Sequence, residues 1–168
     1  MVLYNKELWN AQKRIRRGQI MKYKTHNDYD IKTDGTSFKG YLTANYDELV
    51  KAFGEPMDIK LLKQDACWDI EFEDGTIATI YNWKNGVNYC GVEGQNVQHI
   101  RDWHIGGFSM NAEIEVDKVL KFKRDFYNKY AQCDGECASY HFKEDLYNIP
   151  HHLEELKICK TCANNGDF

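Results

Sequence analysis

Hydrophobic and polar residues alternate in several short segments of the chain, as they do in β-strands with a covered face. Segments 36–43, 66–72 and 76–83 show this pattern and carry aromatic and β-branched side chains. A further short strand is expected at 87–91, and segment 102–107 is expected to be the last strand. The pattern therefore predicts a small sheet that ends before residue 108.

Segments 66–72 and 76–83 are predicted to pair as a hairpin. The sequence EDG at 73–75 separates them, and an Asp-Gly pair supplies the positive φ angles that a tight hairpin turn requires. Apolar residues occupy both faces of the two strands. Because strands covered on both sides have this composition, we expect the hairpin to lie centrally in the sheet.

Two segments have the 3.6-residue period of helices that bury one face. In the first, Asn45 is a predicted helix cap, and Glu48 three residues later completes a capping box. Gly54 should end this helix, and Pro56 should keep it from resuming. The second helix, expected at 112–131, is the longest. Together the elements predict an α+β fold, a small antiparallel sheet packed with two main helices.

The same pattern divides the chain into three predicted parts. Residues 1–35 contain a basic helix at 3–17 and a polar linker or extended arm at 21–35. Residues 36–131 form the α+β core. Residues 132–168 form a short appendage that contains most of the cysteines.

The composition is that of a folded globular protein, with 29% charged and 42% hydrophobic residues in a chain of 168. No apolar run approaches the roughly 20 residues that cross a bilayer, and the N-terminus lacks the features of a signal peptide. We therefore expect a cytoplasmic protein with no membrane partner. The net charge of −4 argues against a dedicated duplex-binding protein.

One stretch departs from this acidic balance. Residues 6–24 hold seven basic side chains and a single acid, Glu7. Such a run could contact nucleic acid or an acidic partner, or it could be the solvated face of a basic helix.

Four cysteines near the C-terminus have the spacing of metal ligands. They form two pairs, Cys133-x3-Cys137 and Cys159-x2-Cys162. Two thiolate pairs can close a tetrahedral Zn²⁺ site, and four protein ligands leave no open position for a water nucleophile, so the predicted role is structural. Three histidines could replace one thiolate: His141, His151 and His152. Reduced structural cysteines and two disulfides are the alternatives, although a cytoplasmic location disfavours disulfides.

Histidine and glycine stand together in the sequence DWHIGG at 102–107. His104 could serve a hydrolase, with Asp102 nearby, but the chain shows no nucleophile elbow, phosphate-binding loop or deaminase signature. A structural histidine at a strand is the simpler interpretation. We therefore expect a protein that is not an enzyme.

A binding role has more support in the same region. Glycines lack a Cβ and allow close approach of a ligand, aromatic rings can stack on a base, and cations can meet phosphate. The candidate ligand-binding residues are Tyr81, Lys84, Arg101, Trp103, His104, Gly106, Gly107 and Arg124. The alternative is a packed tryptophan followed by a glycine turn into the next helix.

Three sequence stretches carry a resemblance to a family. GYLTANYDELVKAFGEP, ACWDIEFEDGTIATIYNWK and WHIGG together resemble a compact module common in bacteriophage genomes, over roughly half of the chain from Gly35 to about Leu120. The module is in turn similar to phage Thoeris anti-defence proteins. Those proteins sequester cyclic ADP-ribose-type signals made by TIR-domain immune proteins and do not degrade them, and related sponges capture cyclic oligonucleotides.

The resemblance implies a function and a ligand class. It implies a phage counter-defence protein in the cytoplasm of an infected bacterium, which sequesters a nucleotide-like immune signal without degrading it. Aromatic and cationic side chains near WHIGG would then hold adenine and phosphates. The basic N-terminal arm and the cysteine tail depart from the compact module. They leave open a zinc-stabilised phage protein that binds nucleic acid or inhibits a host macromolecule, and self-association into a homo-oligomer also stays open.

Overall fold

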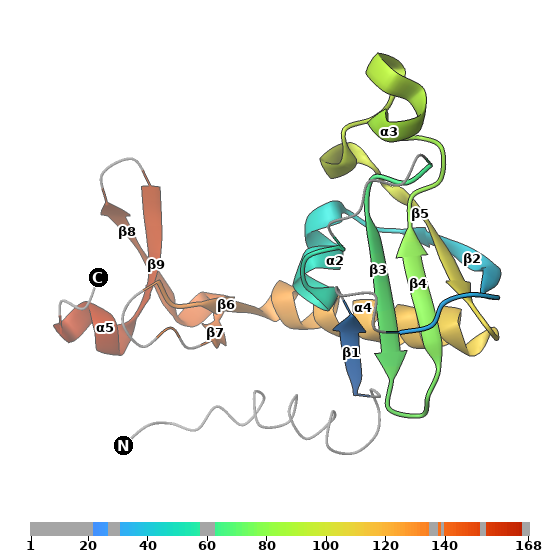
Figure 1. Cartoon of the computed structure of the whole chain (residues 1–168). Helices are drawn as coiled ribbons and strands as arrows, with labels where there is room; N and C mark the ends of the chain where they lie inside the picture. The colour runs from blue at the N-terminus through green and yellow to red at the C-terminus, as the bar shows by residue number, and fades with distance from the viewer. Residues whose placement is uncertain are drawn as a thin grey trace. The chain divides into compact units, whose positions relative to one another are not determined.

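The computed structural model describes residues 22–26, 31–57, 63–134, 138, 140–151 and 154–165. These residues belong to two compact units, one ending at Lys123 and the other beginning at Arg124 (Figure 1). The helix expected at 3–17 lies outside the described residues. Among the helices of the described part, none is long and apolar enough to span a membrane.

The first unit is built on a five-stranded antiparallel sheet with strand order β1-β3-β4-β5-β2 (Figure 1). The strands are β1 (Tyr23–His26), β2 (Ser37–Thr43), β3 (Cys67–Phe72), β4 (Ile77–Tyr81) and β5 (Asp102–Gly107). The strands expected at 36–43, 66–72, 76–83 and 102–107 are confirmed, and the β3–β4 hairpin lies centrally as predicted. Strand β1 comes from the segment expected to be a linker or arm, and it pairs with β3.

The hairpin turn differs in detail from its prediction. Only Gly75 has a positive φ, of 83°, and Asp74 does not share it. The amide of Gly75 donates to the carbonyl of Phe72, and the Asp74 carboxylate accepts from the amide of Thr76 at 2.8 Å. This is a three-residue hairpin loop with glycine in the left-handed position, and Asp74 fixes it through its side chain.

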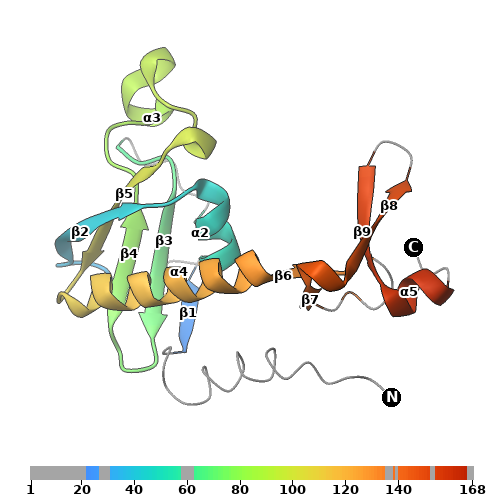
Figure 2. The ribbon, with the colours of Figure 1, turned by 180° about the vertical axis from the view of Figure 1, so that it is seen from behind.

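Two helices cover one face of the sheet. Helix α2 (Tyr46–Phe53) begins with the predicted capping box, in which the Asn45 amide donates to the Glu48 carboxylate at 2.7 Å. It ends at Gly54, where φ is 82°. Helix α4 (Asn111–Lys129) is the long helix predicted at 112–131, and Figure 2 shows its first turns in front of the sheet.

Two tryptophans form the centre of the core between sheet and helices. Trp68 of β3 and Trp103 of β5 are fully buried, and their rings meet edge to face at 5.4 Å. Each indole N–H donates to a backbone carbonyl, that of Gly54 at 2.8 Å and that of Ala44 at 3.0 Å. Burying a ring of this size contributes roughly 4–6 kcal/mol before entropy is counted.

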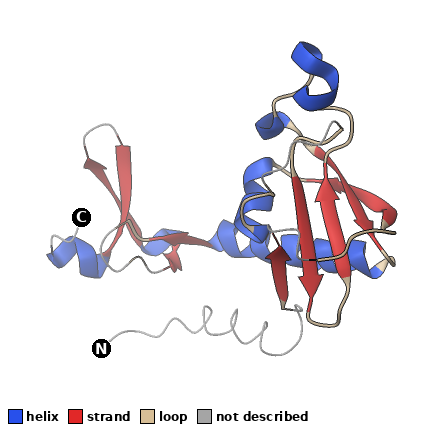
Figure 3. Ribbon diagram, in the orientation of Figure 1, coloured by secondary structure: helices blue, strands red, loops and turns tan. Residues whose placement is uncertain are grey.

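The expectation of a strand at 87–91 is wrong. Residues Val87–Cys90 form helix α3, followed by the 3₁₀ helices η1 (Gly91–Glu93) and η2 (Val97–His99) (Figure 3). The Asp65 carboxylate accepts from the Asn88 amide at 2.9 Å and so satisfies a free donor of the first helical turn. Short apolar runs do not separate strand from helix by pattern, so a distant acid decides the conformation here.

The second unit contains two small two-stranded sheets, so β5 is not the last strand of the chain. Its elements are β6 (Tyr130–Gln132), β7 (Tyr140–Phe142), η3 (Lys143–Asp145), β8 (Leu146–His151), β9 (Glu154–Cys159) and α5 (Lys160–Asn165). Phe126 stacks on Tyr130 at 4.9 Å and meets Tyr140 edge to face at 5.2 Å. The α+β class with a cysteine-containing C-terminal appendage is confirmed, whereas the three-part division at residues 35 and 131 stays a prediction.

The close packing of β5 against α4 can be tested at Gly107. A Cβ at this position would lie 2.5 Å from the Cβ of Ala112 and 2.9 Å from the Ile77 carbonyl oxygen, and neither atom can turn away. Gly107→Ala should therefore lower the free energy of unfolding by about 1–3 kcal/mol in urea titrations. The control Val92→Ala, at an almost fully exposed position, should change it by less than about 0.5 kcal/mol. Equal effects of the two substitutions would refute this packing.

Candidate functional site

Five ring-bearing side chains lie together on the face of the sheet opposite the helices. They are Phe38 and Tyr41 of β2, Tyr81 of β4, Trp83 just after β4 and His104 of β5, here called the aromatic face. Between ring centroids, His104 lies 5.3 Å from Phe38, 5.1 Å from Tyr41 and 5.5 Å from Tyr81. Phe38 and Tyr41 are 4.8 Å apart, and Tyr81 and Trp83 are 6.2 Å apart. His104 is therefore the hub of a continuous array.

The aromatic face presents apolar surface to solvent. Tyr41 is 72% exposed, Phe38 47% and Trp83 40%. Their mutual contacts are edge to face, the arrangement that the charge distribution of aromatic rings favours. Such contacts hold each ring in place and leave ring surface uncovered. Contiguous exposed apolar patches of this kind mark interaction sites on soluble proteins.

A β-bulge creates part of this array. The pairing of β2 with β5 shifts between Phe38 and Gly40, so that Phe38 pairs with Gly106 and Tyr41 with His104. In a regular strand, residues three apart point to opposite faces. The extra residue at Lys39 puts both rings on the same face. Neither Phe38 nor Tyr41 was predicted as a ligand residue, and strict alternation along a strand would put them on opposite faces.

The environment of His104 sets its protonation state. Partial burial lowers the pKa of His104, because exclusion of water disfavours the charged imidazolium. The neutral ring offers one hydrogen-bond donor and one acceptor. At neutral pH this position therefore provides a polar edge within an aromatic surface.

The two glycines of the WHIGG stretch leave room for neighbouring atoms of the same chain. A Cβ at Gly106 would lie 2.5 Å from Thr79 Oγ1 and 3.4 Å from Tyr81 Cε1, so the missing side chain makes room beneath the aromatic face. Gly107 faces the other way and packs against Ala112 of α4. Of the two predicted ligand-binding glycines, only Gly106 lies beside the aromatic face.

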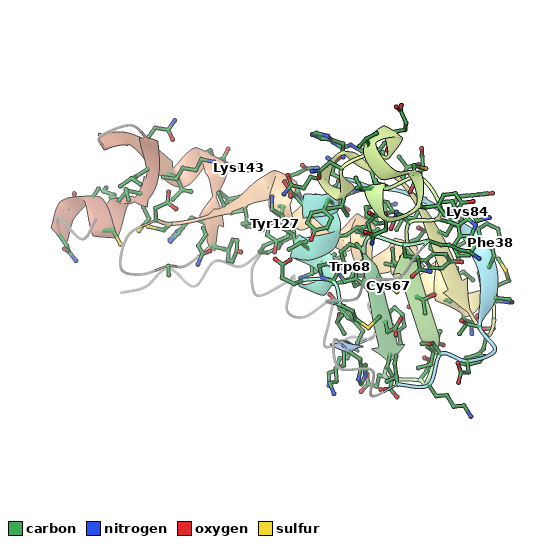
Figure 4. All side chains as sticks on the ribbon, turned by 45° about the horizontal axis from the view of Figure 1, so that its top comes forward. Phe38, Cys67, Trp68, Lys84, Tyr127 and Lys143 are labelled. Carbon is green, nitrogen blue, oxygen red and sulfur yellow. The ribbon has the colours of Figure 1, made fainter. Side chains whose placement is uncertain are left out.

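The other predicted residues divide between several locations. Tyr81 and His104 belong to the aromatic face. Lys84, labelled in Figure 4, has its ammonium group 5.5 Å from the centroid of the Trp83 ring. The ring of Trp103 is fully buried in the core and leaves no surface for a ligand. The Arg101 guanidinium donates to the carbonyls of Gln98 and Ile100. Arg124 belongs to the second unit.

Residues 82–99 form a lobe that carries cations over aromatic rings. Lys63 Nζ and Lys84 Nζ lie 5.4 Å and 5.5 Å from the centroid of the Trp83 ring, and Lys84 Nζ lies 5.3 Å from that of Tyr89. These distances are those of cation–π contacts. The sequence analysis missed Lys63, Trp83 and Tyr89 as site residues, although the aromatic and basic letters of NWKNGVNY were a usable signal.

A buried amide fixes this lobe to the sheet. Asn82 is fully buried, and its Oδ1 accepts from the amides of Asp65 at 2.7 Å and Ala66 at 3.1 Å. Its Nδ2 donates to Asp65 Oδ2 and to Asn85 Oδ1, both at 2.9 Å. Because these groups are satisfied only in this arrangement, the network holds the neighbouring Trp83 and Lys84 in position.

On β3, Cys67 and Asp69 form a second, buried polar group. The thiol donates to Asp69 Oδ1 at 3.6 Å. Burial raises the pKa of the Cys67 thiol far above its ordinary value, and the nearby Asp69 carboxylate adds to the shift. Burial also raises the pKa of Asp69. A thiol held protonated in this way is a poor nucleophile.

Three cysteines of the second unit converge and could hold a metal ion. The sulfur atoms of Cys133, Cys159 and Cys162 lie within 4.8 Å of one another, and all three side chains are buried. Cys133 follows β6, Cys159 ends β9, and Cys162 lies in the first turn of α5. A disulfide joins two sulfur atoms, so it does not account for three that converge.

The surrounding backbone supports the cluster. The Cys159 amide donates to the sulfur of Cys133 at 3.3 Å. The Asp134 amide donates to the Lys157 carbonyl at 2.9 Å, and the Lys157 amide donates to Asp134 Oδ2 at 2.7 Å. These bonds join the turn after Cys133 to β9 and orient the ligands, as outer-shell hydrogen bonds do in metal sites.

The remaining predicted ligands are only partly placed. Cys137 and His152 lie outside the described residues. His141 lies in β7 and His151 ends β8. His141 is not among the converging ligand atoms found in the part of the chain that the structure describes, and the side chain of His151 lies outside that description.

Comparison with known proteins gives no relative: no protein-family model matches the chain, and no curated protein matches it either.

The burial of His104 predicts a titration below the ordinary histidine value of about 6.5. The unfolded state then binds more protons than the folded state between the two pKa values, so stability should fall as the pH drops below about 6.5 and through the folded pKa. NMR titration of the imidazole signals measures the pKa directly, with His104→Phe identifying the signal. A midpoint at or above the ordinary value would contradict the described environment.

Proposed function

We propose that the protein binds a nucleotide-derived ligand on its aromatic face and sequesters it without degrading it. In biological terms the proposal is a phage counter-defence protein that captures an immune signal in an infected bacterium. The observation that carries it is the array of five fixed rings with Lys63 and Lys84 beside it. The resemblance of the WHIGG module to phage anti-defence proteins supports the biological assignment.

The physical argument is that a fixed ring array suits a flat ligand. Stacking of a base on an aromatic side chain contributes about 1–3 kcal/mol and tolerates any base, since every base has a π-face. Rings that are already held by one another lose little side-chain entropy when a ligand arrives. Nearby ammonium groups add attraction for phosphate.

The surroundings of His104 support binding rather than hydrolysis. Histidine acts as a general base when a nucleophile and an orienting partner lie within hydrogen-bond reach. The ring of His104 contacts the rings of Phe38, Tyr41 and Tyr81. This setting favours a role for His104 in holding a ligand.

For the cysteine cluster we propose structural Zn²⁺. An all-thiolate donor set suits zinc, and the spacing in the sequence offers Cys137 as the fourth ligand. The cluster connects the strand that follows α4 with the β8–β9 hairpin and α5, all of them short elements. Metal binding would supply much of the stability that so small a core lacks.

Ligand binding is tested by isothermal titration calorimetry with cyclic ADP-ribose isomers and cyclic oligonucleotides. At least one should bind and be recovered intact after long incubation. Phe38→Ala should weaken that binding roughly 5- to 150-fold, the equivalent of one lost stacking contact. The control Phe108→Ala removes a ring of similar exposure, 53% against 47%, and should leave the affinity unchanged. Absence of binding by every ligand tried would remove the support for a sponge, and degradation would show an enzyme.

Zinc binding is tested by elemental analysis of the purified protein. We expect close to one zinc ion per chain and a strong loss in Cys159→Ser. The matched control is Cys90→Ser, an exposed cysteine of the first unit, which should keep its zinc. Chelation should make residues 132–168 protease-sensitive and leave the sheet of the first unit folded, because none of the four cysteines lies there. A metal-free protein with a protease-resistant tail would exclude the site.

A further inference from the structure

Two lysines, Lys84 of the lobe and Lys63 from the segment before β3, converge on one tryptophan ring. Both ammonium groups, of Lys63 and Lys84, lie within 5.5 Å of the centroid of Trp83. Each distance is that of a cation–π contact, so the Trp83 ring attracts both ammonium groups. Both cations therefore lie beside one ring of the aromatic face.

The backbone holds the two lysines in register. The Lys84 amide donates to the Lys63 carbonyl at 2.9 Å, which ties together the main chains that carry the two cations. The Lys84 carbonyl accepts from the thiol of Cys90 at 3.2 Å, which ties it to α3. The backbone positions of the two lysines are therefore held beside each other.

Lys84 also adopts a backbone conformation that lysine rarely takes. Its φ is 58°, in the left-handed region where a side chain is unfavourable. Such positions persist only where surrounding contacts enforce them, and they concentrate in ligand clamps. Glycine would fit here without cost, so the presence of a cation at this position points to a use for the cation.

Internal carboxylates do not neutralise the pair. Asp65, the acid closest to Lys63 in the sequence, has both oxygens engaged by Asn82 and Asn88. Between described residues, the ion pairs within 4.0 Å join other groups and include neither lysine. The positive charge of the two lysines is thus available to an external anion.

We infer that Lys63 and Lys84, whose ammonium groups both lie within 5.5 Å of the centroid of the Trp83 ring, form a phosphate subsite. The ligand class is a nucleotide that carries a pyrophosphate or a phosphodiester, since two cations suit two negative charges. This inference rests on the proposed function, because Trp83 joins the subsite to the aromatic face, where the base would stack. The subsite would select a ligand that carries negative charge, and the aromatic rings would select one that carries a flat group.

The test titrates inorganic pyrophosphate into the full-length protein and follows the Trp83 indole signal by NMR, assigned with Trp83→Phe. The signal should shift saturably, and Lys84→Gln should weaken binding roughly tenfold or more, as loss of a charge-assisted contact does. Lys118→Gln, which removes a lysine from α4 that pairs with Glu115, is the matched control and should leave binding unchanged. No saturable shift, or equal loss in the control, would overturn the subsite.

A second variant separates binding from folding. Lys84→Gly removes both the cation and the steric conflict at φ 58°, so it should raise the thermal unfolding midpoint while weakening pyrophosphate binding. A lower midpoint with unchanged binding would overturn the inference.

The two proposals fail in different ways. If nucleotide ligands bind Lys84→Gln as tightly as the natural chain, the subsite is wrong and the proposed function stands. If pyrophosphate shifts Trp83 but nucleotides bind no tighter than pyrophosphate, the subsite stands and the base-stacking face is wrong. Equally tight, salt-dependent binding of unrelated duplex DNA would show a general polyanion surface and overturn the subsite.

Discussion

Burial of one face of the five-stranded sheet is the constraint on which the rest of the first unit depends. Trp68 and Trp103 fill the space under α2 and α4, and each indole N–H is satisfied by a backbone carbonyl. Because neighbouring residues of a strand point to opposite faces, fixing Trp103 in the core places His104 on the other face. The core therefore sets the direction of the His104 side chain, at the centre of the aromatic face.

The opposite face of the sheet is organised around His104. Edge-to-face contacts with Phe38, Tyr41 and Tyr81 hold the ring and leave apolar surface in water. Exposing such rings gains nothing for folding, and for this reason the proposed function assigns them to a flat ligand. The lobe after β4 extends this surface with cations, and the buried Asn82 holds it in place.

The sequence predicted those features that local chemistry decides. The capping box and the hairpin follow from residue types at short spacing, and the structure contains both. Of the four cysteines predicted to converge, three do so among the described residues. Prediction from the sequence failed where contacts between distant residues decide the structure. Segment 87–91 is helical because Asp65 satisfies its first turn. A bulge at Lys39 puts Phe38 beside Tyr41. Trp103 was expected at the ligand because its ring could stack on a base, yet strand alternation turns it into the core.

The most direct test of the central claim is an NMR map of the surface that a nucleotide contacts. ADP-ribose is a suitable probe, because it joins an adenine to a pyrophosphate. The account predicts that signals of Phe38, Tyr41 and His104 shift saturably, while the indole signals of Trp68 and Trp103 stay in place. Shifts confined to the cysteine-containing unit, or to the helical side of the sheet, would contradict the assignment of the aromatic face.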